Sequence, residues 1–176
     1  FSSYSNDYGV PGEHAESDTL IEMESDRFEF RSEIEITDSD WLTGIELNFG
    51  YGDYKHSESG YETENNVTEW HTHSTYLREG FEGKIIFNHQ LGELNGVIGF
   101  HGLLDEFKIV GEESIFGGAS GTNSAISSED TTKLGVFIIE EYQVDENTRL
   151  DGGIRFDSIE RDYTGVSDRD DSTFSA

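Results

Sequence analysis

Apolar residues recur at every second position along much of this chain, which is the spacing of a β-strand. In the segment 41–51 the odd positions are mainly large and apolar, whereas the even positions from Gly44 onward are small or polar. Successive side chains of a strand point to opposite faces, so this segment would have one apolar and one polar face. The segment 27–36 alternates in the same way, and the polar residues 37–40 are typical of a turn. The two segments therefore predict a β-hairpin.

Two further hairpins are predicted downstream. Segments 81–88 and 95–107 alternate on either side of one turn, and segments 133–142 and 150–157 alternate on either side of another. Together with the first hairpin they predict an all-β fold, an antiparallel meander of about six strands.

The segment before the first hairpin has a change of parity. Ile21 and Met23 occupy odd positions, whereas Phe28 and Phe30 occupy even ones. Because a regular strand keeps one parity on each face, we expect a bulge or a strand start between the two pairs.

The connections between the predicted strands are of two kinds. Those within hairpins, at 37–40, 91–93 and 145–147, are short, whereas 54–75 and 108–132 are long, acidic and rich in Ser, Gly and Asn. Long loops in a compact domain usually carry function. Short turns on one side and long loops on the other are typical of an outer-membrane β-barrel.

The polar faces of the strands mix glycine with charges of both signs. Arg31 lies near Glu33 in the sequence, and Arg155 lies near Asp157. Such a face favours the water-filled or plugged interior of a barrel. His101 falls on the polar face of its strand and is expected to be a histidine of this interior wall. Aromatic residues at strand ends, such as Trp41, Tyr51 and Tyr142, would form the girdles at the membrane interfaces.

Other functions stay open on pattern alone. A secreted acidic β-sandwich that binds calcium, as an adhesin module would, also has strands with one apolar and one polar face. A hydrolase would need two carboxylates on one strand face beside aromatic residues; Glu33 and Glu35 have the spacing, but no aromatic residue shares their face. We therefore expect no enzymatic activity.

Composition narrows the choice further. The chain has 11 Lys and Arg against 38 Asp and Glu, a net charge of −27, which excludes the basic surface that nucleic acids require. It has no Cys, so disulfides and thiolate zinc sites are excluded. No apolar run is long enough for a transmembrane helix. The 12 Phe, 8 Tyr and 2 Trp argue against an intrinsically disordered chain.

Several short motifs, in order along the chain, resemble TonB-dependent outer-membrane receptors, particularly the branch tied to zinc uptake. They are Tyr8–Gly12 with the His- and Glu-containing loop after it, Ile21–Arg31, Phe49–Tyr54, Gly111–Phe116, Phe137–Tyr142 and Leu150–Arg155. The resemblance covers nearly the whole chain.

The resemblance implies a fragment of a roughly 22-stranded transmembrane β-barrel, with residues 1–176 as a partial barrel that has neither the plug domain nor the C-terminal strand. It implies the outer membrane of a Gram-negative bacterium, with lipid bilayer and lipopolysaccharide around the barrel. The TonB complex would act through the missing plug domain. The transported ligand would be a metal ion or metal chelate, zinc or siderophore-like, and no resident cofactor is expected.

His71 and His73 are the sharpest candidate metal ligands. Two positions apart on an extended segment, they would point the same way, about 6.5 to 7 Å apart, and a metal ion could bridge their imidazoles. Glu69 and Glu64 could add oxygen ligands. The competing interpretation is a solvated loop in which two histidines happen to lie close, because metal sites need three or four ligands.

His14, with Glu13 and Glu16, is a second candidate. The resemblance implies that this loop is His-rich in the zinc-uptake branch, where it would collect metal at the extracellular mouth; here only His14 is present. A solvated acidic loop is the alternative. The segment 168–171 could suggest a calcium loop but lacks the spacing of an EF-hand.

Overall fold

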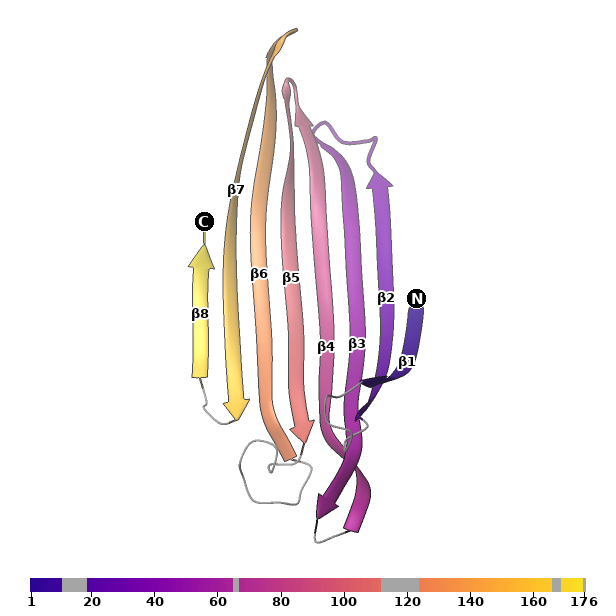
Figure 1. The fold of residues 1–176 in the computed structure, drawn as a ribbon. Coiled ribbons are helices and arrows are strands. Elements are labelled where there is room, and N and C mark those ends of the chain that lie inside the picture. Colours follow the sequence, from indigo (N-terminus) through magenta and orange to yellow (C-terminus); the bar gives the residue numbers. More distant parts are fainter. Residues whose placement is uncertain (11–18, 65–66, 112–123, 166–168, 176) are drawn as a thin grey trace.

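The chain folds into one antiparallel sheet in which each strand pairs with its neighbours in sequence (Figure 1). The computed structural model describes residues 1–10, 19–64, 67–111, 124–165 and 169–175. The strands are β1 (Ser2–Val10), β2 (Thr19–Glu35), β3 (Leu42–Glu64), β4 (Val67–Leu91), β5 (Leu94–Gly111), β6 (Ser124–Asp145), β7 (Thr148–Gly165) and β8 (Arg169–Ser175). The predicted all-β antiparallel meander is confirmed.

The sheet has eight strands where the sequence predicted about six. The two additional strands are the shortest, β1 at nine residues and β8 at seven, and they form opposite edges of the sheet. Strand β1 has three Ser, one Asn and one Asp among its nine residues, and β8 has two Ser and two Asp among its seven. Their side chains therefore give little of the apolar contrast from which the other strands were predicted.

The long loops predicted at 54–75 and 108–132 are largely strand. The β3–β4 pairing continues as far as Glu64 and Val67, and β5 pairs with β6 as far as Gly111 and Ser124. Pairing uses backbone groups, so polar side chains do not prevent it. In Figure 1 the β3–β4 hairpin reaches farthest at the lower end of the sheet.

Short connections occur where the sequence predicted them, but the predicted contrast with a long loop at 54–75 is wrong, because β3 runs to Glu64 and β4 begins at Val67. The connections at 36–41, 92–93 and 146–147 share one end, called here the turn end and drawn uppermost in Figure 1. The other end is called the loop end. Gly92 has φ +65° in a two-residue turn, a backbone conformation that glycine adopts without steric cost.

The predicted irregularity between Met23 and Phe28 is wrong. β2 pairs with β3 without a register shift from Leu20 to Glu35. Ile21 and Met23 simply lie on the face opposite to Phe28. Toward the loop end this opposite face shields an apolar side chain from solvent, because Ile21 is only 8% exposed there.

One face of the sheet, called here the apolar face, carries four lateral rows of mainly apolar residues. From the loop end they are Phe28, Tyr51, Phe81 and Leu104; Phe30, Phe49, Gly83, Gly102 and Leu134; Ser32, Leu47, Ile85, Phe100, Val136 and Phe156; and Ile34, Ile45, Phe87, Ile98, Ile138 and Ile154.

These apolar side chains have no protein core to bury them. Leu134 is 61% exposed and Phe100 50%, whereas Ile21, at 8% exposed, is the one large apolar side chain that is buried in the described part of the chain. So large an exposed apolar surface requires an apolar surrounding.

Polar rows bound the apolar face at both ends. Toward the loop end runs a lateral row of acids, called here the acidic row: Asp26, Asp53, Glu79, Glu106, Asp130 and Asp162. Toward the turn end, His89 Nε2 lies 3.2 Å from the Glu140 carboxylate. Glu79 and His89 are ten residues apart on β4, about 33 Å along the strand. With a usual tilt near 40° this is about 25 Å, the height of the apolar band of a membrane barrel.

Candidate functional site on the polar face

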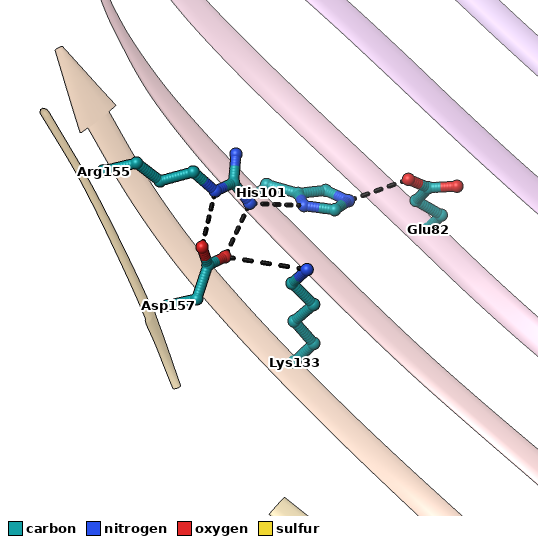
Figure 2. Close-up of polar contacts among 5 residues, drawn as sticks. All are labelled: Glu82, His101, Lys133, Arg155 and Asp157. Atoms are coloured by element: carbon teal, nitrogen blue, oxygen red, sulfur yellow. Dashed lines mark hydrogen bonds and ion pairs between the residues drawn. The ribbon is translucent and has the colours of Figure 1, made fainter. Parts of the chain in front are cut away.

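The opposite face, called here the polar face, carries a group of charged side chains that are connected through a histidine (Figure 2). Its members, called here the ionic network, come from four consecutive strands: Glu82, His101, Lys133, Arg155 and Asp157. They converge because the strand register brings their positions into neighbouring rows.

His101 joins the two halves of the ionic network. Its Nε2 lies 2.8 Å from Glu82 Oε1, and its Nδ1 lies 3.2 Å from Arg155 Nη2. A guanidinium can only donate, so Nδ1 accepts that hydrogen bond. Nε2 then carries the ring proton and donates a hydrogen bond to Glu82 Oε1, which assigns the neutral Nε2–H tautomer to His101.

Arg155 and Asp157 form the strongest contact of the ionic network. They lie two residues apart on β7 and therefore share a face. Arg155 Nε and Nη2 each donate to one Asp157 oxygen at 2.6 Å. Paired donors of this kind hold a carboxylate in a fixed orientation. Lys133 Nζ, 3.8 Å from Asp157, adds a second cation.

Glycines beneath the ionic network make room for these side chains. A Cβ at Gly135 would lie 2.7 Å from both Arg155 Nη2 and Asp157 Oδ1. A Cβ at Gly99 would lie 2.0 Å from the ring of Phe137, and Arg155 packs over that ring at 5.6 Å. Glycine at these positions thus lets large side chains lie flat on the sheet.

A groove of about 950 Å³ lies beside the ionic network on the polar face. Its floor includes Gly50, Gly52 and Gly80. At one side Arg78 Nε donates to both oxygens of Asp105, at 2.9 and 3.2 Å. A groove with charges of both signs and a backbone floor can contact a polar ligand or a polypeptide segment without desolvating an unpaired charge.

His71 and His73, the first predicted metal ligands, lie in strand β4 and not in a loop. His71 pairs with Gly60, and its Nε2 is 3.6 Å from Glu69 Oε2. The register shifts between Thr72 and Ser74, so His73 is the extra residue of a bulge. The regular alternation from which a shared direction was predicted is therefore interrupted here.

No group of three or more His, Asp or Glu suited to a metal ion occurs among the described residues. The second predicted group, His14, Glu13 and Glu16, lies outside the described residues, as do Asp168 and the side chain of Glu64. Metal binding at the loop end stays a prediction.

The sequence placed His101 on the interior wall but not its partners. Glu82 and Lys133 lie in segments that were predicted as strands, but nothing in the alternating pattern singled them out. The two-residue turn at Gly92 fixes the register between β4 and β5, so the proximity of Glu82 to His101 could have been derived. The contact with Arg155, 54 positions away, depends on the β5–β6 register, for which no short turn gives a signal.

Comparison with known proteins gives a family match over the whole chain. The family model described as "TonB dependent receptor-like, beta-barrel" matches residues 1–176. No curated protein matches. No helix long and apolar enough to cross a membrane occurs in the residues that the structure describes.

Proposed function

Because the chain belongs to the TonB-dependent receptor β-barrel family, we propose that its sheet is barrel wall of an outer-membrane receptor for a scarce metal ion or metal chelate. The family is one of transporters and implies the Gram-negative outer membrane. The observation that carries the proposal is the two-faced sheet, with an apolar band about 25 Å high on one side and the ionic network on the other.

In this proposal the polar face lines the interior of the barrel, and the barrel has roughly 22 strands. The wall performs no bond chemistry. Some of its carboxylates are paired, as in Arg155–Asp157 and Arg78–Asp105, so these carboxylates would not trap a passing cation. The plug domain, acted on by the TonB complex, would open the path.

The charge of the chain supports a cation such as a zinc ion as ligand and gives no support to a neutral or anionic chelate. The net charge is −27, and the acidic row lies toward the loop end on the outward face of the wall. A surface of one sign raises the local concentration of ions of the opposite sign. Zinc and a ferric siderophore are the two ligand classes that we propose, and the family match does not choose between them.

Uptake by intact cells tests the function. We expect a strain lacking the receptor gene to lose uptake of either labelled zinc or a labelled ferric siderophore under metal limitation. A strain lacking TonB should lose the same uptake. Wild-type uptake of both ligands in the receptor mutant would refute the proposed ligand class, whereas loss without TonB dependence would refute the mechanism.

Metal capture at the loop end is a separate part of the proposal, involving His71 and His73 together with His14, Glu13 and Glu16. We expect the His71→Ala/His73→Ala receptor to bind zinc about tenfold more weakly, or about 1.4 kcal/mol, by calorimetry. His56→Ala, on the neighbouring strand, is the matched control. Equal zinc affinity in the double variant and in wild type would eliminate these two ligands.

A further inference from the structure

The apolar face has a depression in its loop-end half. Gly83 on β4 and Gly102 on β5 are direct cross-strand partners in the second apolar row. With no side chain at either position, the sheet backbone is the floor of a groove of about 710 Å³. This volume lies within the usual range of ligand pockets.

Apolar side chains surround this floor. They are Phe49, Ile85, Phe100, Leu134, Val136 and Phe156. Phe49 leans toward the groove, because a Cβ at Gly83 would lie 3.2 Å from its ring. Phe49 also stacks between Phe30 and Phe81, with centroids 6.3 and 6.2 Å apart. This aromatic stack forms one wall of the groove.

The depth of the groove determines what covers it. Gly83 is four residues from Glu79 in the acidic row and six from His89 at the other boundary. At 3.3 Å per residue and a tilt near 40°, it lies about 10 Å inside the apolar band. The groove is continuous with the bilayer-facing surface of the barrel and has hydrocarbon around it. Since short turns of such barrels are periplasmic, the groove faces the outer leaflet.

We propose that this groove is a binding site for one acyl chain of an outer-leaflet lipid. The ring faces and branched side chains of the walls offer dispersion contacts on several sides of a hydrocarbon chain, whereas the remainder of the apolar face offers one side only. The side chains of these walls offer no hydrogen-bonding groups, and a methylene chain needs none. The site is separate from the uptake path on the polar face.

Filling the floor should remove the site without disturbing the sheet. A Cβ at Gly102 would meet only Leu134 Cδ2, at 3.7 Å, so Gly102→Leu occupies the groove at little steric cost. Ser32→Leu is the matched control, because it adds an equal side chain to the same face outside the groove. Heat-modifiable migration in gels reports whether each variant folds, and Gly102→Ala is the milder substitute if Gly102→Leu does not.

The experiment uses the full-length receptor in lipid nanodiscs containing a phospholipid with a photoreactive diazirine in one acyl chain. After irradiation, mass spectrometry locates the labelled peptides. We expect labelling to concentrate at the groove residues of β4, β5 and β6. In Gly102→Leu that labelling should fall about tenfold, equivalent to about 1.4 kcal/mol, and in Ser32→Leu it should stay at the wild-type level.

Two outcomes would overturn the proposal. Labelling spread evenly over the apolar face and unchanged by Gly102→Leu would mean that the lipids are only a general annulus. A groove protected from the lipid, together with receptor dimers in the nanodiscs, would mean that a second copy covers it. Neither outcome depends on uptake, so a failure of the transport proposal would be seen separately.

Discussion

At the scale of single residues, glycine determines where large side chains lie on this sheet. Glycines 96, 99 and 135 each face a neighbouring atom that an added Cβ would approach within 3.0 Å, whereas an added Cβ at Gly152 would meet nothing within 4 Å. In the sequence these glycines look alike, because each is a small residue in an alternating pattern. The side chains and backbone of the neighbouring strands determine which of them can be substituted and which must stay glycine.

We expect Gly96→Ala to destabilise the receptor by about 1 to 3 kcal/mol. Its Cβ would lie 2.5 Å from the carbonyl oxygen of Ile139, a backbone atom that cannot move away without straining the strand. Gly152→Ala is the control, since Gly152 pairs with Glu140 in the same lateral row and should change stability by less than about 0.5 kcal/mol. Unfolding of the purified receptor in denaturant measures both, and equal losses would contradict the explanation.

A second residue-level expectation concerns the ionic network. Arg155→Ala leaves Asp157 with the more distant Lys133 and removes the donor to His101 Nδ1. Because the Arg155 side chain is 40% exposed, we expect a loss of no more than about 1 kcal/mol in stability but a slower ligand uptake. Arg149→Ala, on the same strand and face, is the comparison; if both variants transport at the wild-type rate, the network has no part in transport.

At the scale of elements, the β3–β4 hairpin extends well past the acidic row, where cross-strand side-chain contacts join its two strands. One of them is the edge-to-face pair of Tyr61 and Trp70, with ring centroids 4.9 Å apart. We expect Trp70→Ala to weaken this end of the hairpin by about 0.5 to 1.5 kcal/mol without changing global stability. Hydrogen exchange of residues 59–61 and 67–72 measures it, with Val67→Ala as control. Faster exchange throughout β3 and β4 would contradict a local role.

The turn after β6 gives an expectation for pH. Asp145, beyond the apolar band, accepts a hydrogen bond from the backbone N–H of Asn147 at 2.8 Å, which lowers the pKa of its carboxyl. A lowered folded pKa stabilises the turn above the ordinary Asp pKa of about 3.9, and this contribution is lost as pH falls through the folded pKa. Amide protection of Asn147 should therefore drop in acid. Asp145→Ala should remove this dependence, whereas Glu146→Gln should keep it.

The alternation of side chains was enough to predict the hairpins of the sheet but not its full extent. Segments with strong apolar contrast, such as 41–51, were predicted correctly because one face meets hydrocarbon. The polar parts of β3 and β4 were missed because, beyond the acidic row, both faces of a strand are polar. The bulge at His73 and the contact between His101 and Arg155 depend on register between strands, which side-chain periodicity within one strand does not contain.

At the scale of the whole molecule, the sheet has no interior of its own. A soluble β-sandwich would need a second sheet over the apolar face, and the residues that the structure describes form a single sheet. Phe28, Leu134 and Ile154 are each about half exposed or more. In a barrel of the matched family this face meets the bilayer, and we expect its two polar boundaries to set the bilayer thickness that suits it.

That thickness can be changed by substitution. Wild-type receptor should be most stable in bilayers with a hydrocarbon thickness near 25 Å. In His89→Leu/Glu140→Leu the polar boundary at the turn end becomes apolar and joins the row of Leu91, Leu94, Tyr142 and Leu150. The band gains two rows, four residues along each strand, so at a tilt near 40° the optimum should move by about 10 Å toward thicker bilayers. Midpoints of thermal unfolding across lipids of increasing chain length measure this shift. Glu141→Leu, on the polar face of the same strand, should leave the optimum unchanged, and a shift in that variant, or none in the double variant, would show that these rows do not set the membrane position.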